Sequence, residues 1–153
     1  MKTIPIGKTE ILCRGADLVI FAIGNTVLSA LSAANLLKKR GINATVVNTR
    51  FAKPLDEELI CALAQETGAV VTVEENVLAG GFGSAILETL EQNRVYGVKV
   101  KRIGIPDKFV EQGPQKILRK KYGLDETGIF QTALCLLDIK DVRKAFPTRV
   151  RAI

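Results

Sequence analysis

Leu18-Val19-Ile20-Phe21-Ala22-Ile23 is the stretch that decides the fold, because an apolar run this short fits a strand buried on both faces. Gly24-Asn25-Thr26 then breaks the run and offers a helix N-cap. The residues that follow repeat apolar side chains at helical spacing, namely Val27, Ala30, Leu31, Ala34 and Leu37. Gly41 ends this helix, and a second apolar strand is predicted over Ala44–Thr49. Two strands joined through a helix predict a parallel βαβ unit.

The same alternation continues along the chain. Further strands are predicted over Ala69–Val73 and Val98–Ile103, and the remaining helices over residues 54–67, 84–92, 114–122 and 125–137. A short strand at Glu10–Cys13 leads into the next strand through a tight turn, which favours an antiparallel edge strand. Right-handed crossovers place helices on both faces of a parallel sheet. The residues therefore predict a three-layer α/β/α, Rossmann-like domain with a mostly parallel sheet and an antiparallel edge strand.

Composition excludes several kinds of catalytic site. The chain has 153 residues and no histidine, so it contains no Ser-His-Asp triad, Cys-His pair or HExxH zinc site. The net charge of +6 is concentrated in residues 139–153, which carry +4 and leave only +2 for the first 138 residues. Only one aromatic residue, Phe146, stands among those terminal charges. A solvated or docked basic tail is therefore favoured over an arm that binds nucleic acid.

Cysteine usage and hydropathy indicate the compartment. Cys13, Cys61 and Cys135 are far apart, are flanked by apolar residues and form no CxxC pair, so we expect free thiols buried in the core. Unpaired cysteines favour a reducing compartment. The longest apolar run is too short to cross a membrane, and residues 1–8 lack the apolar segment of a signal peptide. We expect a cytoplasmic protein that has neither a membrane nor a nucleic acid as partner.

A glycine loop, Gly80-Gly81-Phe82-Gly83-Ser84, lies between a predicted strand and a predicted helix, where backbone amides can bind phosphate. It does not match G-x-G-x-x-G/A, because Ile86 occupies the sixth position counted from Gly81. It also lacks the Gly-Lys-Ser/Thr of a P-loop. A tight turn, or a backbone surface that packs closely on a neighbour, is favoured over a ligand site.

Three other segments could form a site. Gly24 follows the first buried strand, where open α/β sheets often bind ligands, but helix initiation alone explains it. Glu74-Glu75 ends a strand, and because alternate strand residues face opposite ways, a structural role is favoured over an acid/base pair. A buried glutamate there would need a lysine, arginine or backbone amide as partner. The stiff polar loop Gly104–Gly113 is either a contact surface or an ordinary connector.

Several motifs together resemble a known family. They occur in the order Asn48-Thr49-Arg50-Phe51-Ala52-Lys53-Pro54-Leu55-Asp56, Val73-Glu74-Glu75-Asn76, Gly80-Gly81-Phe82-Gly83-Ser84, Gly104-Ile105-Pro106-Asp107-Lys108-Phe109-Val110 and Tyr122-Gly123-Leu124-Asp125. This set resembles the C-terminal, third domain of the 1-deoxy-D-xylulose-5-phosphate synthases, thiamine-diphosphate enzymes of the transketolase group. The resemblance covers about residues 4 to 138. It divides the chain into a linker or N-terminal extension at 1–8, a transketolase C-terminal-like domain at 9–139 and the basic tail at 140–153.

The resemblance implies a five-stranded mixed sheet and a parent transferase. That enzyme condenses pyruvate with glyceraldehyde 3-phosphate, releases carbon dioxide and feeds isoprenoid, thiamine and pyridoxal synthesis, with thiamine diphosphate and Mg²⁺ as cofactors. In the family, the Gly-Asp-Gly…Asn motif that holds the diphosphate and metal, and the residues that handle substrate, belong to the first two domains. None of them maps onto this chain. We expect no catalytic, cofactor-binding or metal-binding residue here, and a domain that is inactive alone.

In this family the third domain is chiefly a structural and dimer-contact element, so its expected partners are the upstream catalytic domains and a second subunit of a homo-oligomer. The residues expected at the interface belong to the glycine loop and the following loop, namely Gly80, Gly81, Phe82, Gly83, Asp107, Phe109, Gln112 and Gly113. Two alternatives stay open. One is a stand-alone domain that binds a phosphorylated metabolite, and the other is the C-terminal domain of a related transketolase or 2-oxo-acid dehydrogenase beta subunit.

Overall fold

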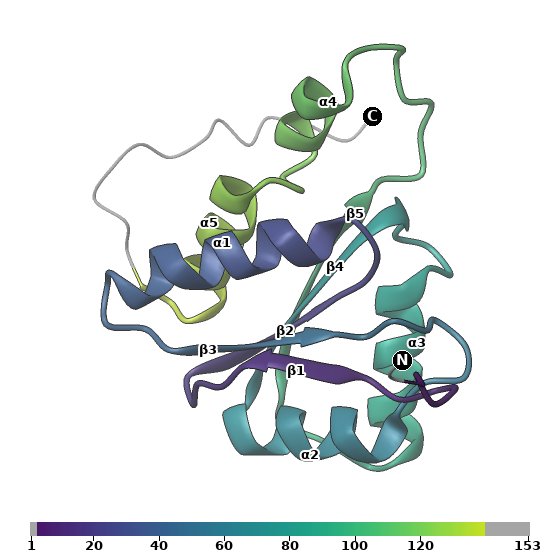
Figure 1. Cartoon of the computed structure of the whole chain (residues 1–153), viewed down its shortest axis with the longest axis vertical. Coiled ribbons are helices and arrows are strands. Elements are labelled where there is room, and N and C mark those ends of the chain that lie inside the picture. The colour runs from purple at the N-terminus through teal and green to yellow at the C-terminus, as the bar shows by residue number, and fades with distance from the viewer. Residues whose placement is uncertain (1–2, 140–153) are drawn as a thin grey trace.

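The computed structural model describes residues 3–139, so the predicted basic tail at 140–153 lies outside the described residues. Five strands and five helices lie within this range (Figure 1). The strands are β1 (Glu10–Cys13), β2 (Leu18–Ala22), β3 (Ala44–Asn48), β4 (Ala69–Val77) and β5 (Lys99–Ile105). The helices are α1 (Thr26–Lys38), α2 (Glu57–Thr67), α3 (Phe82–Gln92), α4 (Gln115–Lys121) and α5 (Glu126–Leu136).

The strands form one mixed sheet in the order β1-β3-β2-β4-β5. The pairs β2–β3, β2–β4 and β4–β5 are parallel, whereas β1 pairs with β3 in the antiparallel sense. The predicted sheet and its antiparallel edge strand are therefore confirmed.

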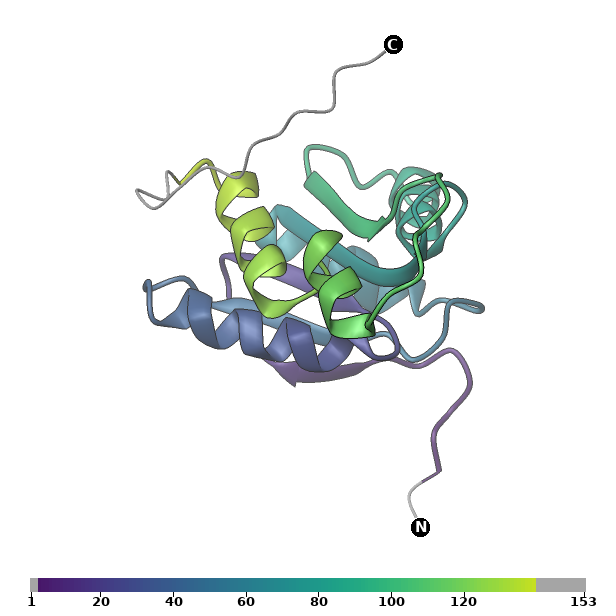
Figure 2. The same cartoon turned by 90° about the horizontal axis from the view of Figure 1, so that it is seen from above.

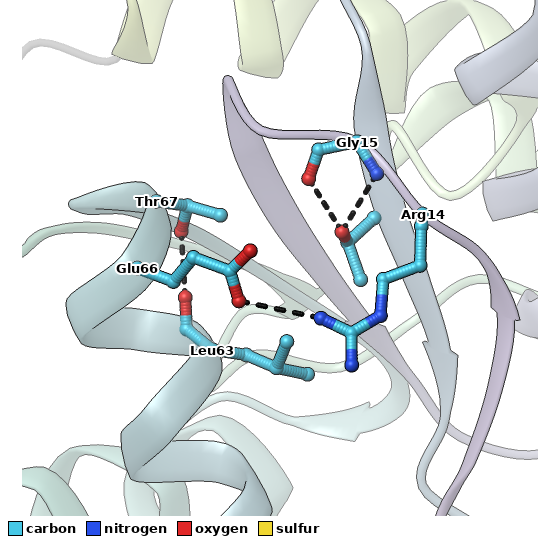
Figure 3. A network of polar contacts seen from close by, with 6 residues as sticks. Arg14, Gly15, Leu63, Glu66 and Thr67 are labelled. Carbon is cyan, nitrogen blue, oxygen red and sulfur yellow. Dashed lines mark hydrogen bonds and ion pairs between the residues drawn. The ribbon is translucent and has the colours of Figure 1, made fainter.

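The turn between β1 and β2 is held against β3 (Figure 3). The amide of Gly15 donates to Thr45 Oγ1 at 2.9 Å, and that hydroxyl donates to the carbonyl of Gly15 at 2.6 Å. A Cβ at Gly15 would lie 2.3 Å from the carbonyl carbon of Asn43, so only glycine fits here. On the same turn, Arg14 forms an ion pair with Glu66 of α2 at 3.3 Å. These contacts explain why the turn brings β1 back along β3.

Helices cover both faces of the sheet, which gives three layers (Figures 1 and 2). Helices α1 and α5 pack on one face, and α2 and α3 pack on the other. Alternate residues of β2 enter opposite layers, so Ile20 contacts the α1 side while Phe21 contacts the α2 side. All five residues of β2 are buried, as the unbroken apolar run predicted.

The structure differs from the predictions at several element ends and in the burial of the cysteines. Strand β4 continues to Val77 because its pairing with β5 resumes at Val77 and Ile105 after an irregularity. Helix α2 begins at Glu57, three residues later than predicted, with Asp56 as its N-cap. Cys13 and Cys61 are only partly buried against the core. The prediction that Cys135 is a core thiol is wrong, because Cys135 is exposed while Ala133, Leu134 and Leu136 carry the buried side of α5.

Candidate interaction surface

The carboxyl edge of the sheet is where a ligand would be sought first. Strand β2 leads into α1 on one face and β4 leads towards α3 on the other, so the connections diverge between these neighbouring strands. Here Asn25 Nδ2 donates to Glu75 Oε2 at 3.3 Å, and Arg119 Nε of α4 forms an ion pair with Glu75 Oε1. Because these polar groups satisfy one another, the crevice presents an internal polar cluster and offers little to a phosphate.

Glu74 is fully buried and belongs to the fold. Its carboxylate accepts hydrogen bonds from the amides of Phe82 and Gly83, both at 2.7 Å. Those amides are the first donors of α3, where the positive end of the helix favours an anion. The predicted structural role of the strand-end glutamate is confirmed, and of the three kinds of partner expected, the structure shows backbone amides.

The backbone amides at the start of α3 are therefore already hydrogen-bonded and are not free to bind phosphate. Glu74 occupies the amides of Phe82 and Gly83, and the amides of Ser84 and Ala85 donate to the carbonyl of Gly81. Arg102 fixes the two ends of the loop. Its guanidinium donates to Leu78 O at 2.9 Å and to Ser84 Oγ at 2.8 Å. The alternative of a metabolite site built on this loop is not supported by its geometry.

Three of the glycine-loop residues expected at an interface pack closely against the rest of the domain. Phe82 is 3% exposed and Gly83 is buried. A Cβ at Gly81 would lie 2.2 Å from Val77 O, and a Cβ at Gly83 would lie 2.6 Å from Thr72 Oγ1. Internal contacts thus explain the small residues. Phe82 and Gly83 are buried, whereas Gly81 is partly exposed. Gly80 alone of the four is exposed, and it adopts a positive φ of 70°.

The second predicted loop does lie on the surface. Residues 106–114 connect β5 to α4 and extend beyond the end of the sheet (Figure 1). Asp107, Phe109, Gln112 and Gly113 are all exposed, and the Phe109 ring has no shielding at all, at 104% of its reference area. The loop therefore presents a large aromatic side chain to whatever lies next to the domain.

Contacts with the end of α4 hold this loop in place. Glu111 forms an ion pair with Lys121 and accepts a hydrogen bond from Tyr122 Oη at 3.2 Å. The hydrogen bond from Lys121 is the main cause that lowers the pKa of Glu111. Lys108 lies over the Tyr122 ring, with Nζ 5.5 Å from the ring centroid.

A hollow of about 300 Å³ lies between this loop, the ends of β4 and β5, and α4. Apolar side chains from the loop and α4 supply part of its wall, among them Val110, Leu118 and Tyr122. Glu75 and Arg119 supply its charged edge. Prediction from the sequence missed Arg119, because its partner Glu75 is 44 residues away and no spacing rule relates a basic helix to that carboxylate.

Side chains that could bind a metal are not grouped in the described residues. Between residues 3 and 139, no group of three His, Cys, Asp or Glu side chains is arranged to hold a metal ion. The described part of the chain therefore offers no such ligand cluster for Mg²⁺. Burial raises the pKa of Cys61, which makes its thiol a poorer nucleophile. None of the helices that the structure describes is long and apolar enough to span a membrane.

The fold defines a Rossmann-like domain of the α/β/α type. The model of the transketolase C-terminal domain matches residues 7–129, and the chain belongs to that family. It is 57% identical over 129 residues to 1-deoxy-D-xylulose-5-phosphate synthase 1 of Geobacter sulfurreducens. The aligned residues make up 84% of this chain and 20% of that protein. It is 54% identical over 138 residues to the synthase of Heliobacterium modesticaldum, covering 90% of this chain and 21% of the relative. The predicted resemblance to the C-terminal domain of these synthases is confirmed.

A solved structure shows the same fold. A chain described as a split gene transketolase, inactive beta4 tetramer, matches with a TM-score of 0.82 and 38% identity, over 90% of this chain and 45% of that one. The chain spans about a fifth of the length of the curated relatives it matches.

Proposed function

We propose that the chain serves as the C-terminal domain of a 1-deoxy-D-xylulose-5-phosphate synthase and supports its assembly without taking part in the chemistry. The observation that carries this proposal is 57% identity to one fifth of such a synthase, over nearly the whole of the described domain. In the complete enzyme, pyruvate and glyceraldehyde 3-phosphate would react on thiamine diphosphate and Mg²⁺ held by other domains. No cluster of three potential metal ligands lies among residues 3–139, so the proposal places the metal in the other domains.

The proposed partners are the catalytic domains of the synthase and a second subunit. Among the residues expected at the interface, those of loop 106–114 and Gly80 are exposed, and Gly81 is partly exposed. The three cysteines are free, so a reducing, cytoplasmic location is part of the same proposal.

A graft tests the proposal. The matching C-terminal segment of the Geobacter sulfurreducens synthase is replaced with this chain, and product formation from pyruvate and glyceraldehyde 3-phosphate is measured with thiamine diphosphate and Mg²⁺. We expect the graft to be dimeric and active, whereas the same synthase truncated before that segment and the isolated chain should both be inactive. An inactive graft, or turnover by the isolated chain, would contradict the proposal.

A further inference from the structure

The surface around loop 106–114 combines a projecting apolar group with an apolar hollow. Phe109 is fully exposed and Ile117 of α4 is 63% exposed, whereas their neighbours Val110 and Leu118 line the hollow of about 300 Å³. Single exposed apolar residues are common on protein surfaces, but grouped ones beside a hollow are typical of contact sites. The hollow is large enough to receive an apolar side chain from a partner.

The loop is held in position before any partner binds. Glu111 is held by Lys121 and by the hydroxyl of Tyr122, and Lys108 rests over the Tyr122 ring. A partner therefore does not have to order the whole loop, and contacts made by Phe109 lose less conformational entropy.

The charge of this surface points to the chemistry of its partner. Residues 107–121 contain five basic and two acidic residues, a net charge of +3. Glu75 neutralises Arg119 and Glu111 neutralises Lys121. Lys116 and Lys120 form no ion pair with any residue in the range 3–139. They lie one helical turn apart on α4, next to Ile117. An acidic surface would complement them.

The same charges argue against a second copy of this domain as the occupant. In a two-fold symmetric contact the same patch faces itself, so residues 107–121 of one copy, with a net charge of +3, would face the same net charge on the other. Like charges brought together across an interface oppose association. The occupant is therefore a different surface.

We infer that loop 106–114 and the exposed face of α4 dock onto an acidic, apolar surface of the catalytic part of the synthase, with Phe109 as the inserted side chain. This inference rests on the proposed function and specifies which surface performs it. The domain would thus contact its partner through the carboxyl edge of its sheet and not through the interior glycine positions.

Hydrogen exchange in the grafted synthase tests the docking directly. We expect peptides that cover residues 106–121 to exchange at least about tenfold more slowly in the active graft than in the isolated chain. Peptides from the C-terminal end of α1, at the opposite edge of the sheet, should exchange equally in both. Equal exchange of residues 106–121 in an active graft would overturn the inference and leave the proposed function standing. An inactive graft would instead count against the proposed function.

Matched variants separate the apolar and charged contributions. Phe109→Ser, and the double change Lys116→Glu with Lys120→Glu, should each remove most of the protection in the graft. Tyr96→Ser and the double change Lys38→Glu with Lys39→Glu make equivalent changes at exposed sites elsewhere and should leave the protection intact. Thermal unfolding of each isolated variant reports any loss of folding. Protection that survives both test variants would overturn the inference.

Two further measurements test other occupants. Sedimentation of the isolated chain at up to about 200 μM should show a monomer, and vesicles that contain anionic phosphatidylserine should not bind it at physiological salt. A dimer abolished by Phe109→Ser would show that the occupant is a second copy. Vesicle binding abolished by the Lys116 and Lys120 changes would show that it is a membrane. Either result would overturn the inference.

Discussion

At the scale of single residues, Glu74 links the sheet to the glycine loop. An exposed carboxylate would be stabilised by water, but this one has no exposed surface and depends on two amides at 2.7 Å. Removing the carboxylate would leave both amides buried without an acceptor, and an unmade buried hydrogen bond costs more than a made one contributes. The glutamate and the glycines after it are therefore one structural unit.

Glu74→Ala should lower the free energy of unfolding by about 3 kcal/mol, because two charge-assisted hydrogen bonds are lost from a buried site. Glu74→Gln, which keeps one side-chain oxygen as acceptor, should lose about half as much. The measurement is urea unfolding followed by circular dichroism. The matched control is Glu75→Gln, at the exposed neighbour, with an expected loss below about 1 kcal/mol. Equal stability of Glu74→Ala and the unsubstituted chain would refute this account.

Gly81→Ala should destabilise the domain by about 2 kcal/mol, because the added Cβ would lie 2.2 Å from Val77 O and must displace backbone. Gly113→Ala is the control, since its Cβ would meet only ordinary contacts, the nearest at 3.7 Å from Leu118. Both variants are compared by urea unfolding of the isolated chain. A harmless Gly81→Ala would mean that the loop is glycine-rich for a reason outside this domain.

At the scale of elements, the start of α2 is joined to the segment that leads into β1. Asp56 at the N-cap of α2 accepts hydrogen bonds from Lys8 Nζ at 3.0 Å and from the Thr9 amide at 3.2 Å. Burial alone would raise the pKa of Asp56, but these hydrogen bonds outweigh burial and lower the pKa below its usual value. The ionised carboxylate is therefore the form that the fold prefers.

The pH dependence of unfolding follows from that lowered pKa. A carboxyl group with a lower pKa in the folded state stabilises the fold above its unfolded pKa of about 4, and this contribution is lost as the pH falls through the folded pKa. The unfolding free energy should therefore decline below about pH 4. Asp56→Asn should flatten part of this decline, and Lys8→Met should reduce it as well. An unchanged acid profile in Asp56→Asn, measured by urea unfolding at several pH values, would contradict the role of this pair.

At the scale of the whole molecule, one sheet separates two apolar layers. Leu134 of α5 lies in the first layer and Ile86 of α3 in the second, and both pack on strands of the same sheet. Because the strands contribute to both layers, the loss of either layer exposes the other. The domain should therefore unfold as one cooperative unit.

Leu134→Ala and Ile86→Ala should each lower the free energy of unfolding by about 2–5 kcal/mol, the usual cost of truncating a buried side chain. Each should shift a single transition that is identical by circular dichroism and by tyrosine fluorescence. Leu28→Ala, at a side chain that is 74% exposed, is the control and should change stability by less than about 0.5 kcal/mol. Two separate transitions in either core variant would show that the layers unfold independently.

The amino-acid sequence by itself determined the alternation of strands and helices, the antiparallel edge strand and the buried character of Leu18–Ala22. These features follow from local spacing and turn chemistry, which act between residues close in the chain. Only the tertiary structure decided that Glu74 accepts hydrogen bonds from the amides of the glycine loop and that Phe82 and Gly83 are buried. It also decided that Arg119 forms an ion pair with Glu75. Those outcomes depend on which strand ends and helices become neighbours in space, and on the volume left for a Cβ, quantities that no local pattern encodes.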